Sequence, residues 1–593
     1  MRAKKALACL LAAFVLLSAG QAFALTGKRT SGFTAKTLDY LPEKARARTD
    51  TLVIGVQDLY GEINPFFAQT TGDSYAAGLM FDELVFSNND GEMGDGVASV
   101  TEQLDVPEEI WLRVEGMDNT SMTYTFTIRE GVSYLDGTPV TSDDFINALY
   151  LLLLPGYDGI YDVSGAGIRG VQEYLSGMAQ TVSGIERVDE RTFIVRLSGK
   201  NASALSMLAF PALRVSVAGD MMRPQDLQPE EYAAFYDQAL QSARTADIPA
   251  MAYGQYGLVS LEEGTRAQFV ANTAYWRGAP KITNVELLVV EPGKELDAIC
   301  SGDVDIISML GSVEGVDAVW DYEEGFINLY TWEGGTVGYL GMDLSASSIF
   351  ADARVRQALA CGCDRQGVVD KTMERYGKAN TMMLFDSFSV NADVLGERYP
   401  YDPSRAQSLL EEAGWALGED GVRVKDGKRL SFTFHYPSPN PVMDTGAELI
   451  AQSYEQLGME VEVIPTPLDE LITLVEQNEC DLYFLARRLP QHAANAAQIF
   501  AGDSHLNLSD YSSSTLDWLM LWADGEGDAQ RQGVMLEALF EQLYLELPVI
   551  PLYQRNEVLL VSARILNCIV TPAHEIISDV YRFMLTDTLS MQW

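Results

Sequence analysis

The chain has 593 residues, of which 47% are hydrophobic and 21% charged, a composition ordinary for folded globular proteins and a length that allows several domains. Its formal net charge of -43 argues against nucleic acid or an anionic membrane surface as a partner, because both would be repelled over the whole surface. The net charge does not predict the charge of a ligand-binding site, which can differ in sign from the rest of the surface.

Residues 1–24 have the pattern of a cleaved secretory signal. Basic residues near the start precede an uncharged run at 6–19, and Ala22-Phe23-Ala24 supplies the small residues that a signal peptidase requires. The run is too short to span a bilayer comfortably, and an uncleaved membrane anchor is the alternative. No cysteine follows the run at a position suited to lipid attachment. We therefore expect a secreted, soluble chain that is periplasmic or associated with the cell envelope, cleaved near Ala24.

The cysteines that remain after cleavage are few, scattered and odd in number, and they form no CxxC pattern. A disulfide is possible in chemical terms in an oxidising compartment. Isolated cysteines in a chain of this length are more often buried small hydrophobic residues, and we expect that role. The residues concerned are Cys300, Cys361, Cys363, Cys480 and Cys568.

The predicted elements begin after residues 25–48, which are polar and basic and which we expect to form a linker. A buried strand is predicted at 51–56, and a helix with apolar residues on one side is predicted at 73–85. The turn at 88–96 has the acids and glycines of a calcium loop, but it lacks the terminal glutamate of a helix-loop-helix site. We therefore expect a hairpin turn there.

The segment 124–149, YTFTIREGVSYLDGTPVTSDDFINAL, carries the most specific pattern in the chain. Apolar and polar residues alternate at 124–129, as in a half-buried strand, and glycines mark the turns that follow. Thr141 stands three residues before Asp144, which predicts a capping box at the start of a helix over 143–152.

The stretch 272–306 predicts a link between two globular bodies. Residues 285–290 form a continuous apolar run, the pattern of a strand buried on both faces. Pro292-Gly293 ends that strand, and a short helix is predicted from Glu295 to a stop at Gly302. We expect the strand to cross between the two bodies and to act as their hinge.

Several segments, in the same order, resemble the extracellular solute-binding proteins of family 5, which serve the oligopeptide and dipeptide ABC importers. The resemblance extends over nearly the whole chain after the predicted signal. Besides 124–149, it rests on NTAYWRGAPKI from Asn272, FADARVRQALACGCDR from Phe350, the Tyr401-Asp-Pro motif with Gly414-Trp415, and LPVIPLY from Leu547.

This resemblance implies an α/β, two-lobed periplasmic-binding-protein-like fold with an extra subdomain in the first lobe and hinge strands between the lobes. The implied divisions follow the chain. They are the signal at 1–24, the linker at 25–48, lobe I at 49–92, 181–290 and 549–593, the extra subdomain at 93–180, and lobe II at 291–548.

The resemblance also implies that an extended ligand lies between the lobes and pairs with strand-like segments, as in β-augmentation. The expected first-lobe contacts are Leu59, Tyr60 and Gly61. In the second lobe, peptide-binding members usually carry an aspartate that neutralises the ligand's α-ammonium, where this chain has Arg487 and Arg488. A cation there would repel an ammonium by about 4 kcal/mol for a close pair near a protein surface.

The two arginines suggest a different ligand group. A guanidinium suits a carboxylate or a phosphate, so Arg487 and Arg488 are expected to face an anionic or polar group. Alternatively, they point to solvent or pair with the many acids of the chain. Together with Tyr60, the residues Trp332, Tyr339 and Phe484 are candidate aromatic walls, and plain core positions are the alternative for each.

No motif in the sequence indicates catalysis or a cofactor. The His574-Glu575 pair is not followed by the second histidine of HExxH, and neither GxSxG nor a phosphate-binding GxxxxGK[ST] loop occurs. We expect no metal and no cofactor, and we expect a binding protein instead of an enzyme. A secreted hydrolase is the remote alternative.

The sequence thus predicts a monomeric receptor that captures a peptide or peptide-like solute and delivers it to an ABC permease with separate ATPase subunits. A receptor that serves a sensor protein is one alternative. A receptor for an oligosaccharide or a metal chelate is another, because the family includes such members.

Overall fold

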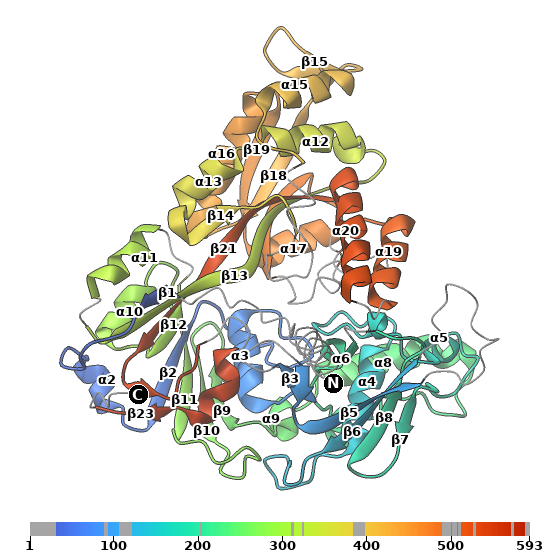
Figure 1. Ribbon diagram of the computed structural model, residues 1–593, viewed down its shortest axis with the longest axis vertical. Coiled ribbons are helices and arrows are strands. Elements are labelled where there is room, and N and C mark those ends of the chain that lie inside the picture. The colour runs from blue at the N-terminus through green and yellow to red at the C-terminus, as the bar shows by residue number, and fades with distance from the viewer. Residues whose placement is uncertain are drawn as a thin grey trace, which may run out of the picture.

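The computed structural model shows a wide lower lobe and a taller upper lobe (Figure 1). The predicted signal and part of the turn at 88–96 lie outside the residues that the structure describes. In those residues, no helix combines the length and the apolar character that crossing a bilayer requires. The described residues are 31–87, 93–105, 121–201, 204–309, 313–322, 325–383, 398–488, 500, 507, 511–525, 529–570 and 575–587.

One twelve-stranded sheet runs through both lobes. Two of its members are short additions, since β1 (Ser31–Phe33) pairs with β13 and β14 (Gly377–Ala379) pairs with β21. The other strands, in their order across the sheet, are β19 (Glu460–Thr466), β18 (Ser431–Pro437), β20 (Leu482–Arg488), β13 (Ile327–Met342), β21 (Val549–Ser562), β12 (Ile306–Ser308), β2 (Thr51–Val56), β11 (Asn284–Val289), β10 (Arg266–Ala271) and β9 (Tyr256–Glu262).

The long antiparallel strands β13 and β21 join the lobes. Ile327 pairs with Ser562 at the lower end of this ladder, and Gly341 pairs with Val549 at the upper end. Figure 1 shows both strands running from the lower lobe into the upper one. The chain therefore enters the upper lobe along β13 and returns along β21.

This topology corrects the predicted hinge at 285–290. Strand β11 pairs with β2 inside the lower lobe, and its side chains alternate between buried and half-buried. The following strand, β12, also pairs with β2. An apolar run cannot distinguish a strand that crosses between bodies from a strand inside a parallel sheet. The predicted start of lobe II at 291 is therefore wrong, because the chain leaves the lower lobe only along β13.

The predicted linker at 25–48 is also corrected from residue 31 onward. Strand β1 pairs with β13, and α2 (Glu43–Ala47) follows it. Leu38, Leu41 and Ala45 are buried in a core that they share with Ile299. Single apolar residues without a period gave no sign of this packing.

A cluster of buried charged residues links the N-terminal arm and the chain that follows β21 to the lower lobe. Asp305 is fully buried, and it pairs with Arg564 Nε at 2.9 Å and with Arg48 Nη2 at 3.2 Å. Its carboxylate also accepts a hydrogen bond from the backbone N–H of Val53 at 3.0 Å. The three partners come from the N-terminal arm, the first long strand and the returning chain, so this cluster closes the lower lobe.

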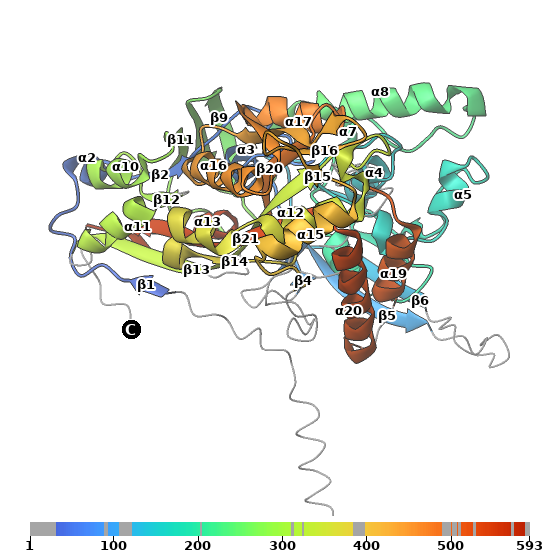
Figure 2. The same cartoon turned by 90° about the horizontal axis from the view of Figure 1, so that it is seen from above.

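A four-stranded sheet lies at the right of Figure 1, and its core is continuous with that of the lower lobe. Two of its strands, at 185–187 and 192–196, follow residue 180, where the predicted extra subdomain ends. The predicted capping box is confirmed, because the Asp144 carboxylate accepts the Thr141 N–H at 2.9 Å. Seen from above, α8 lies at the outer edge of this lobe (Figure 2). These elements are β5 (Ala98–Asp105), β6 (Ser121–Ile128), β8 (Thr192–Arg196), β7 (Ile185–Arg187), α4 (Ser142–Leu152), α5 (Val171–Leu175), α6 (Ala204–Met207), α7 (Val215–Ala218), α8 (Tyr232–Arg244) and α9 (Ile248–Met251).

The remaining elements of the lower lobe lie around the main sheet. Gly302, in the left-handed region at φ 78°, ends α10 as predicted. These elements are α3 (Thr71–Met80), β3 (Val85–Ser87), β4 (Met93–Asp95), α10 (Glu295–Ser301), α11 (Val313–Val319), β22 (Ile565–Leu566), β23 (Met584–Leu585) and the 3₁₀ helix η8 (Ile576–Arg582).

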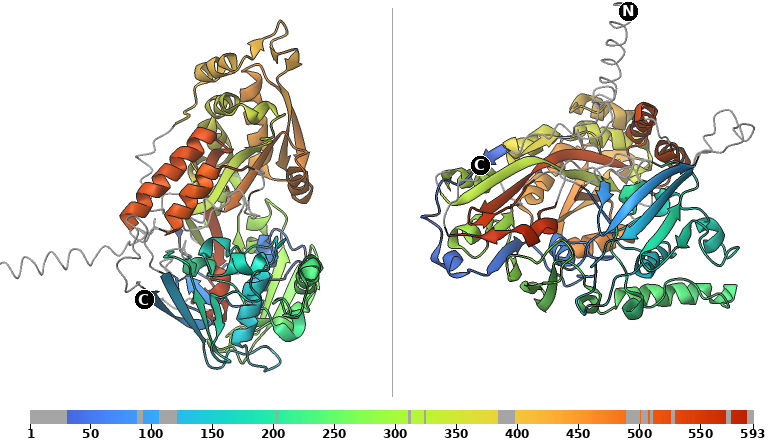
Figure 3. Two further views of the ribbon diagram at one scale, coloured as in Figure 1. Left: turned by 90° about the vertical axis from the view of Figure 1, so that its right-hand side faces the viewer. Right: turned by 60° about the horizontal axis from the view of Figure 1, so that its bottom comes forward.

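The upper lobe has two apolar cores, one on each side of its part of the sheet. The helical pair α19 and α20 lies along its flank (Figure 3). All five cysteines of the described chain are free, and Cys361, Cys363 and Cys480 are buried as expected of small hydrophobic residues. The elements are α12 (Ala353–Gly362), α13 (Arg365–Thr372), α15 (Pro403–Glu412), α16 (Pro441–Glu455), α17 (Leu468–Glu476), α19 (Ser514–Gly525), α20 (Ala529–Glu546), β15 (Ala416–Leu417), β16 (Arg423–Lys425) and β17 (Lys428–Arg429).

Candidate functional site

The ladder between β13 and β21 is interrupted where the chain passes from one lobe to the other. The register shifts over residues 333–337 of β13. Here the buried Gln554 Nε2 donates to the carbonyl of Gly334 at 2.8 Å, and Thr336 Oγ1 donates to the Glu557 carboxylate at 3.0 Å. A bulge breaks the regular ladder and bends the strand. This section is therefore the natural hinge between the lobes.

Below the hinge, the predicted contacts Leu59, Tyr60 and Gly61 form a loop after β2. The buried Asp73 carboxylate accepts hydrogen bonds from the N–H groups of Gly61 at 2.9 Å and Tyr60 at 3.3 Å, and from Thr70 Oγ1 at 3.0 Å. Gly61 has φ 92°, a conformation that favours glycine. Leu59 is buried, whereas Tyr60 is 65% exposed. Asp73 thus holds a rigid loop that presents the Tyr60 side chain.

The Tyr60 loop faces α17 of the upper lobe. Partial burial raises the pKa of Tyr60, and the negative charges of Asp58, Asp469 and Asp73 raise it further. Asp469 lies in the first turn of α17. Interactions between exposed charges are largely screened beyond about 10 Å. Figure 1 shows α17 at the lower end of the upper lobe, on the side of the lower lobe, which agrees with the action of the Asp469 charge on Tyr60.

The surroundings of Tyr60 are acidic, which the sequence interpretation missed. The negative charges of Asp58 and Asp469 both act on the Tyr60 hydroxyl. Asp58 also accepts the N–H of Gly72 at 2.8 Å, which fixes its carboxylate beside the loop. In the sequence, Asp469 looks like an ordinary acid in the first turn of a helix. Only the fold shows that it faces the other lobe.

Strand β20 offers an open side in the upper lobe. One side of β20 pairs with β13 along its whole length, through Arg488. On its other side only Leu482 and Tyr483 pair with β18, and no strand of the described chain pairs with 484–488. Backbone N–H and C=O groups along such a side can bind an extended segment.

The structure brings the predicted site residues Arg487 and Tyr339 together. Arg487 is half-buried and lies opposite Val337 in the ladder. Burial raises the pKa of Tyr339, and the positive charge of Arg487 opposes that rise. The backbone of Arg488 lies opposite Thr336, but its side chain is outside the described part of the structure.

Phe484 is a core residue, and its prediction as an aromatic wall is wrong. Its side chain is fully buried, with its ring centroid 6.0 Å from that of Tyr553. Helix α16 covers it, since a Cβ atom at Gly446 would lie 3.1 Å from the Phe484 ring. Trp332 is half-buried opposite Glu557 and packs against the lower-lobe core. Aromatic residues in β-strands look alike in sequence whether they are buried or exposed.

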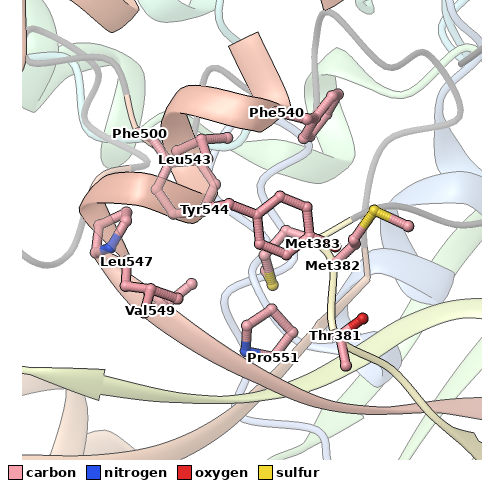
Figure 4. Close-up of a pocket in the computed structure, with 11 residues that line it drawn as sticks. Thr381, Met382, Met383, Phe500, Phe540, Leu543, Tyr544, Leu547, Val549 and Pro551 are labelled. Carbon is pink, nitrogen blue, oxygen red and sulfur yellow. The ribbon is translucent and has the colours of Figure 1, made fainter. Parts of the chain in front are cut away.

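A small cavity lies beside β21 in the upper lobe, between its first residues and α20 (Figure 4). The side chains of Leu543 and Tyr544 on α20, and of Leu547 just after it, face Met383 and Pro551 across it. Its volume is about 30 Å³, close to that of one water molecule. It is therefore too small to hold a solute.

The middle of the chain matches a known family. Residues 114–492 match the profile of the bacterial extracellular solute-binding proteins, family 5. The chain belongs to this family. The match confirms the predicted family, and the structure confirms the predicted two-lobed fold (Figure 1).

The solute-binding protein is 26% identical over 385 residues to the oligopeptide-binding protein OppA of Lactococcus lactis subsp. lactis, with 61% of each chain covered. The chain thus spans about three fifths of the length of the curated relatives that it matches first. AppA from Bacillus subtilis, solved with a nonapeptide, superposes with a TM-score of 0.72 at 18% identity and covers 94% of this chain and 100% of its own. The periplasmic EDTA-binding protein EppA gives a TM-score of 0.70 at 17% identity, with 95% and 99% covered. These two structures show the fold alone.

Proposed function

We propose that this protein is the substrate-binding receptor of an ABC-type importer. It captures an extended, peptide-like solute between its lobes and delivers the solute to a membrane permease whose ATPase subunits are separate chains. The observation that carries this function is the pair of crossing strands with a bulge in β13 at residues 333–337. Two rigid bodies on such a joint can close around a guest.

Each lobe contributes one wall to the proposed binding site. The Asp73-braced loop presents Tyr60 from below, and the open side of β20 supplies backbone groups from above. A solute that contacts both walls favours the closed arrangement, so closure is a population shift. The guest leaves unchanged, because the proposed role is binding without catalysis. The receptor acts outside the cytoplasm as a monomer, exported by the signal predicted at 1–24.

The charges favour a solute with groups of both signs. Asp58 and Asp469 near Tyr60 suit a cationic group such as an α-ammonium. Arg487, at the far end of β20, suits a carboxylate. In the sequence, arginines stand where peptide-binding members of the family usually carry an aspartate for the ligand's α-ammonium. In this proposal, Asp58 and Asp469 take that role from the other end of the site. A peptide carries both groups, with its amino end at the acidic wall.

Mass spectrometry of solutes that co-purify with the protein tests the proposal, followed by calorimetric titration with the peptides identified. We expect Asp469→Asn and Arg487→Ala each to weaken binding by about tenfold or more, the worth of one charge-assisted hydrogen bond. Glu476→Gln on the same helix and Arg429→Ala on the same lobe are matched controls that retain the affinity. If no peptide co-purifies or binds, peptide capture is refuted.

A metal chelate is the second candidate, favoured by the similarity in fold to the EDTA-binding protein and by Arg487 in β20. A chelate carries several carboxylates and no ammonium group. Its binding would therefore depend on Arg487 but improve when Asp469 is neutralised. The response of the Asp469→Asn variant thus separates the two candidates.

A further inference from the structure

A second concave site lies in the lower lobe, with a volume of about 680 Å³. Sites for small molecules range over about 300–1,000 Å³. Its walls come from the β10–β11 connection, the residues after β22, and the end of η8. All of its lining residues belong to the lower lobe, so the site is complete without lobe closure.

The position of this site separates it from the proposed binding site between the lobes. Strand β2 ends at Val56, shortly before the Tyr60 loop that faces the upper lobe. Strand β11 runs parallel to β2, with Asn284 opposite Thr51. The connection that precedes β11 therefore lies at the opposite end of the sheet. Figure 1 likewise places β23, which follows η8, at the base of the lower lobe.

The site is cationic, in contrast to the net charge of -43 of the chain. Arg277, Lys281 and Arg582 line it. Two acids act on these cations. Asp579 pairs with Arg277 at 3.1 Å and with Arg582 at 3.5 Å, and the charge of the buried Asp82 also acts on Arg277. Lys281 is exposed and forms no ion pair with any residue of the described ranges. One net positive charge thus remains after Asp579 and Asp82 are counted, with Lys281 as the exposed cation without an acidic partner among the described residues.

Tyr581 holds both guanidinium groups in place. The guanidinium carbons of Arg277 and Arg582 lie 4.6 and 5.2 Å from its ring centroid. Arg582 Nε also donates to the Tyr581 hydroxyl at 2.7 Å. The backbone N–H of Tyr581 donates to Oε1 of the buried Gln255 at 2.7 Å. The backbone carbonyl of Tyr581 accepts the backbone N–H of Lys281 at 3.3 Å. Both guanidinium groups are therefore held in place before any ligand arrives, which lowers the entropy lost on binding.

We propose that this site binds a small free solute with two or more oxyanion groups, either phosphates or carboxylates. Guanidinium groups bind both with paired hydrogen bonds, and the lysine adds a mobile point charge. The site acts independently of solute capture between the lobes. It gives an otherwise acidic protein a local affinity for polyanions.

Calorimetric titration of the whole protein with sodium tripolyphosphate and with sodium citrate, at low and at physiological salt, tests the proposal. We expect saturable binding to at least one of the two, weakened by salt. The two probes decide between phosphate and carboxylate chemistry. In Lys281→Gln/Arg582→Gln, affinity is expected to fall by at least about tenfold, because two charge-assisted contacts are lost.

Two controls make the result decisive. Arg405→Gln/Lys428→Gln changes the net charge equally on the upper lobe and is expected to bind like the parent protein. Arg487→Ala alters the proposed binding site between the lobes and is also expected to retain polyanion binding. The proposal is overturned if neither probe binds, if the pocket variant binds as tightly as the parent, or if Arg487→Ala abolishes binding.

Discussion

The strongest stability prediction concerns Asp305, because its carboxylate is fully buried between two arginines. In Asp305→Ala, Arg564 stays in a site where its side chain is only 3% exposed, without its ionic partner. Breaking a buried ion pair from one side costs about 3–5 kcal/mol. The N–H of Val53 also loses its side-chain acceptor. We therefore expect the lower lobe to lose at least about 3 kcal/mol of its free energy of unfolding.

Urea unfolding followed by tryptophan fluorescence measures this loss. With slopes of about 1–3 kcal/mol per molar urea, the lower-lobe transition is expected to move down by about 1 M or more. Asp305→Asn keeps an acceptor oxygen without the charge, so its transition should lie between those of the alanine variant and the parent protein.

Asp303→Ala is the matched control, two residues away. Asp303 pairs with Lys44 at the surface, where the side chains are 35% and 63% exposed. Such pairs contribute about 1 kcal/mol or less. Equal midpoints for Asp305→Ala and Asp303→Ala would refute the reasoning. They would also contradict the assignment of residues around 305 to the lower lobe.

Three further predictions test other parts of the fold. Burial raises the pKa of Glu83 from 4.5 to about 8, with Glu575 adding to the rise, so the parent protein should lose stability as pH increases between these values. Glu83→Gln should flatten that slope of melting temperature against pH, and an unchanged slope would contradict it. Burial raises the pKa of Cys363 to about 11, so a thiol reagent at pH 8 should spare it until denaturation exposes all five free thiols of the described residues. Fewer thiols after denaturation would indicate a disulfide. A Cβ atom at Gly334 would lie 2.8 Å from the backbone oxygen of Arg555, so Gly334→Val should lower the melting temperature, whereas Gly94→Ala, with open space, should not.

Local patterns predicted several of the elements. The strand at 51–56 is confirmed with its bounds, and the capping box of Thr141 and Asp144 begins α4. The helix at 73–85 is shorter than predicted, because α3 ends at Met80. Each of these features depends on residues that are near in sequence. The sequence alone is therefore enough to predict it.

The site was harder to predict because it depends on which elements face each other. The hinge lies in β13 and β21, whose mutual pairing joins residues more than 200 positions apart, such as Gly341 and Val549. Asp469 becomes a candidate site residue only because its charge acts on Tyr60 of the other lobe. Phe484 was predicted to line the site, but α16, which is distant in sequence, covers its side chain. Contacts between elements that are distant in sequence leave no periodic pattern in the local sequence.

Small-angle X-ray scattering of the protein with and without its co-purified solute tests the central claim most directly. If the lobes close about the bulge between β13 and β21, saturation with the solute lowers the radius of gyration and changes the shape of the curve. Superimposable curves for the free and the saturated protein would contradict closure as the means of capture.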